Sequence, residues 1–238
     1  MKVSTDRIIL INKPLEWTSF DVVAKIKRPL LNEYRLTFPE EERAQIKKYK
    51  VGHAGTLDPL ATGLLVICSG KFTKSISEIQ DAEKEYTGTI VLGAVTDSYD
   101  LESEPKDFKD YSSITEKEII ALAKEMEGTQ QQIPPMFSAI KVDGERAYEK
   151  ARLGIDLGLK SREITIKTFE ITGIALPEID FRVVCTKGTY IRSLAHDFGK
   201  RLGPGAYLSA LCRTRIGKYQ LVNALSPHDF LAQLTESK

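Results

Sequence analysis

The apolar run LLVIC within GLLVICSG (63–70) constrains the fold more than any other feature of this sequence. A short apolar run bounded by glycines is typical of a strand that is buried on both faces, so other elements must cover it. The residues before it, GHAGTLDPLATG (52–63), contain three glycines, one proline, one histidine and one aspartate. This composition predicts a tight turn that enters the buried strand. It leaves open whether Asp58 only forms the turn or also does chemistry.

The remaining pattern interleaves strands with helices. Runs rich in β-branched residues predict strands, and amphipathic spacing between capping residues predicts helices. We predict strands at 7–14, 84–97, 163–176 and 180–186, helices at 20–28, 115–128 and 191–203, and a last short helix from Ser226–Pro227. The sequence shows no strict βαβ rhythm. The expected fold class is therefore α+β with a mixed sheet.

The expected helix ends and irregular segments complete this prediction. Ser19 is expected to cap the first helix, and Gly128 to end the second, which a capping box of Thr115 and Glu118 opens. Residues 29–50 have the character of an insertion, with a charged helix that Pro39 opens.

The bulk composition excludes several classes of protein. The 238 residues are 42% hydrophobic and 28% charged, which is globular, and no apolar run reaches the roughly 18 residues of a membrane span. The N-terminal run IILI is too short for a secretory signal. Cys68, Cys185 and Cys212 show neither a CxxC pair nor zinc spacing. We therefore expect a cytoplasmic protein with reduced thiols and no membrane association.

The charge distribution is uneven although the net charge is only +1. Residues 1–80 and 151–238 carry an excess of basic side chains, whereas 81–150 are acidic. A folded chain could gather the basic segments on one face, which would suit a phosphate backbone. A solvated surface with uneven charge explains the same numbers.

Asp58 is a candidate nucleophile because the sequence lacks the residue patterns of a phosphate loop, a metal site or a glycosidase. The phosphate-loop pattern GxxxxGK[ST] is absent, and the three histidines show no metal-ligand spacing. Glycoside hydrolysis usually needs two carboxylates, and this motif offers one. A single carboxylate suits a nucleophile that needs neither a metal nor a second acid. On the local sequence alone, a turn-forming aspartate remains the simpler interpretation.

Two further segments contain candidate site residues. In CTKGTYIR (185–192), Tyr190 and Arg192 would share one side if the chain is still extended there, and an arginine beside a carboxylate keeps it ionised. Tyr86 in KEY (84–86) could stack on an unpaired base. Alternatively, Arg192 is a surface arginine in a turn between a strand and a helix, and Tyr86 is a half-buried tyrosine of a strand.

The segment GHAGTLDPLATGLLVICSGKFTK (52–74) resembles the signature of the TruB family of tRNA pseudouridine synthases. Four further blocks follow that family's order: LINKP with WTSFD (10–21), KEY with LGAVTD (84–97), IPPMFSAIKVDGERAYEKAR (133–152), and KGTYIRSL leading to LCRT (187–214). The resemblance implies a largely antiparallel central sheet flanked by helices. It also implies that uridine at position 55, in the T-loop of tRNA, becomes pseudouridine without a cofactor or metal.

The resemblance implies catalytic roles by motif position. Asp58 would be the nucleophile, which attacks the sugar C1′ or the base C6 or assists a glycal route. Arg192 would pair with Asp58. Tyr86 would stack on the flipped base and could remove its C5 proton.

It also implies residues that bind the substrate. His53 would occupy the space that the flipped nucleotide leaves, or contact the loop. Tyr190 and Leu211 would line the pocket, and Lys13 and Lys74 could meet phosphate. The partner is expected to be the T stem-loop of tRNA, bound by a monomer.

The expected organisation is one catalytic domain over 1–238, with the insertion at about 29–50 and an RNA-clamping loop at about 133–152. The family usually has threonine at Ala54, tyrosine at Phe137 and arginine at Cys212. Many members continue into a C-terminal RNA-binding (PUA) domain, which we do not expect here. The alternative function is a module that binds and folds tRNA without catalysis.

Overall fold

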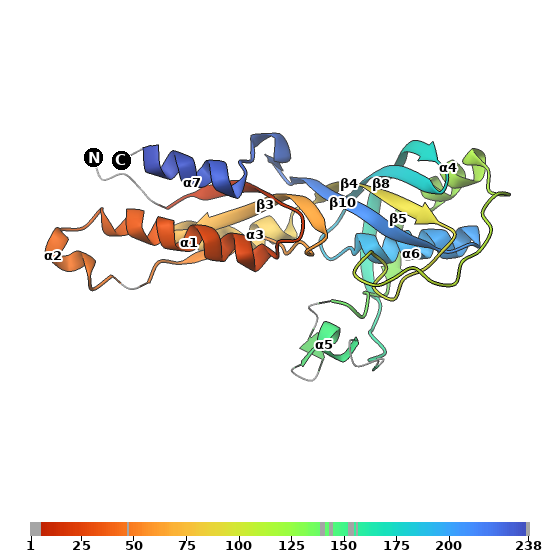
Figure 1. Cartoon of the computed structure of the whole chain (residues 1–238), viewed down its shortest axis with the longest axis horizontal. Helices are drawn as coiled ribbons and strands as arrows, with labels where there is room; N and C mark the ends of the chain where they lie inside the picture. The colour runs from red at the N-terminus through yellow and green to blue at the C-terminus, as the bar shows by residue number, and fades with distance from the viewer. Residues whose placement is uncertain are drawn as a thin grey trace. The chain divides into compact units, whose positions relative to one another are not determined.

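The computed structural model describes residues 6–46, 48–138, 141–142, 145–151, 155 and 157–236 (Figure 1). The chain divides into two compact units. The first unit is Met1–Lys84 with Cys212–Lys238, and the second unit is Glu85–Leu211.

The first unit contains the two ends of the chain. Its elements are β1 (Ile8–Lys13), α1 (Ser19–Arg35), α2 (Glu40–Arg43), β2 (Val51–His53), β3 (Ala61–Ser69), η1 (Gly70–Ser75), α3 (Ile76–Asp81), β11 (Tyr219–Gln220), η2 (Leu221–Asn223) and α7 (Pro227–Glu236). Strand β3 pairs antiparallel with β1 from Gly63 to Cys68, and its last residues, from Ile67 to Ser69, also pair antiparallel with β2.

The second unit is built on a long antiparallel hairpin. Its elements are α4 (Glu116–Glu125), β5 (Gly128–Gln132), β6 (Lys141–Val142), β7 (Glu145–Arg146), α5 (Ala147–Ala151), β8 (Arg162–Ala175), β9 (Glu178–Cys185) and α6 (Ile191–Leu202). Strand β8 pairs with β9 and, at its start, with β5. Of the expected clamping loop at 133–152, residues 139–140, 143–144 and 152 lie outside the described residues.

Strands β4 (Lys84–Leu92) and β10 (Ala206–Ile216) each contribute residues to both units. The strand order is β1-β3-β10-β4-β9-β8-β5, with β2 beside β3 and β11 beside β10. The predicted α+β fold with a sheet flanked by helices is therefore confirmed.

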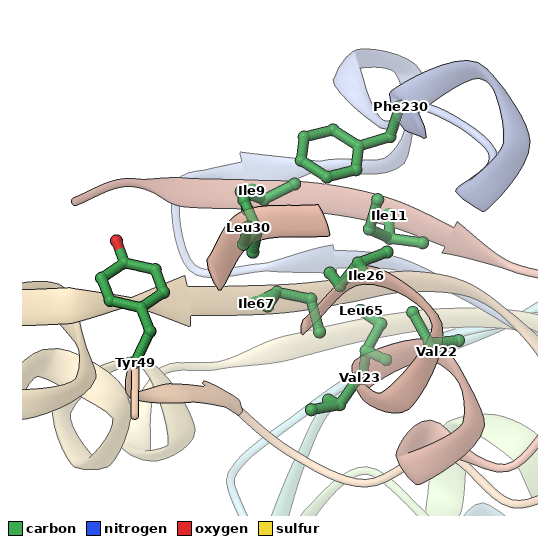
Figure 2. Close-up of a cluster of buried hydrophobic side chains, with 10 residues drawn as sticks. All are labelled: Ile9, Ile11, Val22, Val23, Ile26, Leu30, Tyr49, Leu65, Ile67 and Phe230. Carbon is green, nitrogen blue, oxygen red and sulfur yellow. The ribbon is translucent and has the colours of Figure 1, made fainter. Parts of the chain in front are cut away.

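The core of the first unit lies between α1 and the sheet (Figure 2). Ile9 and Ile11 of β1 and Leu65 and Ile67 of β3 meet the apolar face of α1, and Phe230 of α7 joins the cluster. The buried strand that LLVIC predicts is thus β3, in which all five apolar residues are fully buried. Full burial of such side chains contributes about 1.5–3 kcal/mol each.

Helix α1 differs from its prediction at both ends. Thr18, and not Ser19, caps the helix through a capping box with Asp21. The helix also continues through Pro29 to Arg35, where we expected an irregular insertion. A proline removes one helical hydrogen bond, but the continued helix buries Leu30 completely in the core. Of the charged helix that Pro39 opens, the described residues form only the four-residue helix α2.

In the second unit, aromatic rings join the helices to the hairpin. Phe169 of β8 lies 5.4 Å from Phe198 of α6 and 5.9 Å from Phe181 of β9, measured between ring centroids. Helix α4 has the predicted capping box of Thr115 and Glu118. It ends at Glu125, before the predicted Gly128, because Gly128 already begins β5.

The strand predictions were incomplete. Strand β4 ends at Leu92 and not at 97. Strand β10 was not predicted, because its sequence AYLSALCRTRI mixes polar and apolar residues without a clear alternation. Among the described residues, no helix has the length and apolar character needed to cross a membrane.

Replacing Gly63 tests how closely β3 packs on β10. Gly63 has φ +99°, and a Cβ atom there would lie 2.4 Å from the carbonyl oxygen of Arg213. We expect Gly63→Ala to lower the free energy of unfolding by about 3 kcal/mol or more, because backbone strain and overpacking add.

The matched control is Gly128→Ala, since Gly128 has φ +104° but nothing within 4 Å of the added Cβ. It should cost only the backbone term, about 1–2 kcal/mol. Urea denaturation of both variants measures the difference, and equal losses would contradict the close packing.

Candidate active site

Asp58 does form the turn that its sequence predicts. Its carbonyl oxygen accepts a hydrogen bond from the backbone N–H of Ala61 at 3.1 Å, so Asp58-Pro59-Leu60-Ala61 is a turn with proline in its second position. The Asp58 residue is half-buried, and β3 starts at Ala61. The turn thus places the Asp58 carboxylate just before the first residue of a buried strand.

Ser19 fixes the residue before Asp58 on both sides of its backbone. The Ser19 hydroxyl accepts from the N–H of Leu57 at 2.8 Å and donates to the carbonyl of Leu57 at 3.1 Å. Ser19 is free to do so because Thr18 caps α1 in its place. The start of α1 therefore positions the turn.

Arg213 of β10 fixes the other part of the loop from inside the unit. Its guanidinium donates to the carbonyls of Gly55 at 2.9 Å, Thr56 at 3.3 Å and Leu64 at 2.9 Å. The residue is only 1% exposed. Gly55 has φ +95°, a left-handed conformation that favours glycine. Sequence reasoning missed Arg213 and Ser19, because no local pattern shows that an arginine or serine is buried against a loop.

Lys13 is the second buried cation beneath the loop. Its ammonium donates to the carbonyls of Pro14 at 3.0 Å, Trp17 at 2.5 Å and Pro59 at 3.2 Å. The family resemblance implies that Lys13 could meet phosphate, but here the side chain is fully buried inside the unit. Burial lowers the pKa of Lys13 from 10.5 to about 8, although the charge of Asp58 opposes this shift.

His53 ends β2 close to the same loop. Burial lowers the pKa of His53, and the nearby Arg213 adds to this, while a hydrogen bond with the Gly55 backbone opposes it. The imidazole is therefore neutral at pH 7. Lys74 lies exposed on η1.

In the second unit, Arg192 is held near the start of α6. Its guanidinium donates to the carbonyls of Ser98 at 3.1 Å and Phe137 at 2.8 Å, and its Nε lies 3.5 Å from a carboxylate oxygen of Asp100. Arg192 is 3% exposed, so it is not the surface arginine of the alternative interpretation. Its pairing with Asp58 concerns residues of different units and stays a prediction.

Tyr190 immediately precedes α6. The chain is not extended through Arg192, because the helix begins at Ile191, so the expected side-by-side placement in a strand does not apply. Tyr86 is buried on β4 with 8% exposure, and Leu211 is half-buried on β10. The roles of all three in binding substrate stay predictions.

The pH dependence of stability tests the burial of Lys13. The unfolded chain keeps this lysine protonated up to about pH 10.5, whereas the folded protein does so only up to about pH 8. Between these values the unfolded chain binds more protons, so stability rises with pH.

The stability difference between wild type and Lys13→Met should therefore shift in favour of wild type by about 1–3 kcal/mol as pH rises from about 7 to about 10. Urea denaturation at several pH values measures this difference. A flat or falling difference would show that the ammonium is not desolvated.

The sequence has clear relatives. Residues 43–191 match the model of the family described as TruB family pseudouridylate synthase (N terminal domain). The chain is 55% identical to tRNA pseudouridine synthase B of Flavobacterium johnsoniae, over 92% of each chain. It is 49% identical to tRNA pseudouridine synthase B of Parabacteroides distasonis, over 95% of this chain and 93% of the relative.

A solved structure has a similar fold. One chain in the crystal structure of a Cbf5-Nop10-Gar1 complex superposes with a TM-score of 0.71 at 30% identity. The match covers 98% of this chain and 55% of that chain, so the present chain spans about half of its solved relative. On the family match and the extent of these identities, the chain belongs to the TruB family of pseudouridylate synthases.

Proposed function

We propose that this chain is a tRNA pseudouridine synthase that isomerises the uridine at position 55, in the T-loop of tRNA. The observation that carries the proposal is the rigid presentation of Asp58. Ser19, Arg213 and Lys13 hold the backbone on both sides of this carboxylate. Relatives up to 55% identical over nearly the whole chain bear the name tRNA pseudouridine synthase B, which supports an isomerase acting on tRNA.

The chemistry needs a nucleophile at a sugar or base carbon. In the reaction the bond between C1′ and N1 of uracil breaks, the base turns, and a bond forms between C1′ and C5. The C5 proton leaves and N1 gains a proton. A base inside a folded loop must first be flipped out. In the proposal Asp58 is the nucleophile, at C1′ or C6 or along a glycal route.

The other predicted residues take supporting roles in the same proposal. Arg192 keeps the Asp58 carboxylate ionised, which suits a guanidinium already oriented by two carbonyls and Asp100. Tyr86 stacks on the flipped base. A neutral His53 suits the space left in the loop, because a planar uncharged ring can replace a stacked base.

Binding of RNA is proposed to use loop shape and backbone. Tyr190 and Leu211 line the pocket, and the exposed Lys74 is placed to meet phosphate. We propose a monomer that acts on the T stem-loop in the cytoplasm. The names of the relatives favour catalysis over the alternative of a tRNA-folding module without turnover.

Release of tritium from C5 of uridine tests the function. A tRNA transcript made with C5-tritiated uridine should lose one label per molecule when it is incubated with the protein. A matched transcript in which only the uridine at position 55 is replaced by cytidine should lose none. Label release from the cytidine transcript would contradict the T-loop assignment, and no release from either transcript would contradict the isomerase.

A further inference from the structure

Tyr190 is fixed by a residue at the edge of the second unit's sheet. The side-chain amide of Gln132, the last residue of β5, accepts from the N–H of Tyr190 at 2.8 Å and donates to its carbonyl at 3.0 Å. Gln132 is buried, and it is paired in register with Arg162, the first residue of β8. One residue of this register pair, Gln132, thus supports the backbone just before α6.

Arg162, the other residue of this register pair, stacks on the Tyr190 ring. Its guanidinium carbon lies 4.4 Å from the ring centroid, which is a cation–π contact. This contact uses the face of the guanidinium and not the N–H groups at its edge. Two of its nitrogens, Nε and Nη2, are buried and have no hydrogen-bond partner among the described residues.

Two other arginines of this unit are paired with carboxylates. Arg182 bonds Glu170 at 2.8 Å and Glu85 at 3.1 Å, and Arg201 pairs with Glu125. No carboxylate of a described residue forms an ion pair with Arg162. Burial lowers the pKa of Arg162, but an arginine remains charged at neutral pH.

Buried donors without acceptors cost free energy, so this guanidinium favours an anionic ligand that supplies oxygens. A planar guanidinium that stacks on an aromatic ring and donates from its edge is well suited to a phosphate group. Nε and Nη2 lie on the same edge of the planar guanidinium, so together they match two oxygens of one phosphate.

We propose that Arg162 binds one phosphodiester of the RNA substrate and thereby couples the RNA backbone to Tyr190. The proposal rests on the proposed function for the identity of the ligand. Tyr190 stands two residues before Arg192 in the chain, so the bound phosphate would lie on the nucleotide that is modified or on its neighbour.

The salt dependence of RNA binding tests the contact. Each neutralised phosphate contributes about 0.7–0.9 to the slope of log affinity against log salt concentration. Arg162→Met should reduce this slope for a T stem-loop RNA by about that amount and weaken binding about tenfold at low salt. Fluorescence anisotropy over a series of salt concentrations measures both values.

Arg182→Met is the matched control, because it removes the same charge from an arginine already paired with two carboxylates. It should leave the slope unchanged. Arg162→Lys should keep the slope, since the charge remains, but bind less tightly because the planar stack is lost. Equal slopes for wild type and Arg162→Met would overturn the proposal.

Neutral backbone linkages give an independent readout. T stem-loop RNAs that carry one methylphosphonate at each linkage next to the target uridine should include one that weakens binding to wild type. That linkage should have no further effect on Arg162→Met, or on Arg162→Gln if the methionine variant does not fold, because both variants lack the charge that meets the phosphate. Full additivity at every linkage would refute the contact.

Turnover separates this proposal from the proposed function. If wild type releases tritium and neither the slope nor the linkages respond to Arg162, the phosphate contact is wrong and the isomerase stands. If wild type neither releases tritium nor binds the RNA, the proposed function fails first.

Discussion

The first unit depends on the capture of backbone carbonyls by two buried cations. Arg213 holds the carbonyls of Gly55, Thr56 and Leu64, and Lys13 holds that of Pro59. A buried charge is costly unless it is hydrogen-bonded. If the loop carbonyls moved away, the charges of Arg213 and Lys13 would either lose their hydrogen bonds while buried or become exposed to solvent. This constraint makes the turn at Asp58 rigid.

The same arrangement gives the site its electrostatic character. The charge of Asp58 opposes the loss of the proton from Lys13, which links the carboxylate to the cations under the loop. In the second unit, Arg192 is likewise oriented by carbonyls and by Asp100. Under the proposed function, groups that each unit already orients in this way would need little reorganisation when charge develops in the reaction.

Much of this could be predicted from the sequence, and the misses have physical causes. The LLVIC run predicted β3 because a short apolar run bounded by glycines is typical of a strand covered on both faces. The end of α1 was wrong because burial of Leu30 outweighs the local effect of Pro29. Strand β10 was missed because it carries Arg213, a polar residue that tertiary contacts bury.

The candidate site shows the same division. Asp58 could be selected from its motif, since the glycines and proline around it are local signals. Ser19 and Arg213 act on its loop from 38 and 149–158 residues away in the chain, and no sequence pattern marks such contacts.

Single-turnover kinetics of the Asp58→Asn variant test whether Asp58 is the nucleophile. The substitution keeps the size of the side chain and the turn, but it removes the nucleophilic charge. We expect the variant to bind tRNA about as tightly as wild type and to release tritium at least about a thousandfold more slowly. Release at the wild-type rate would contradict the assignment of Asp58 as the nucleophile.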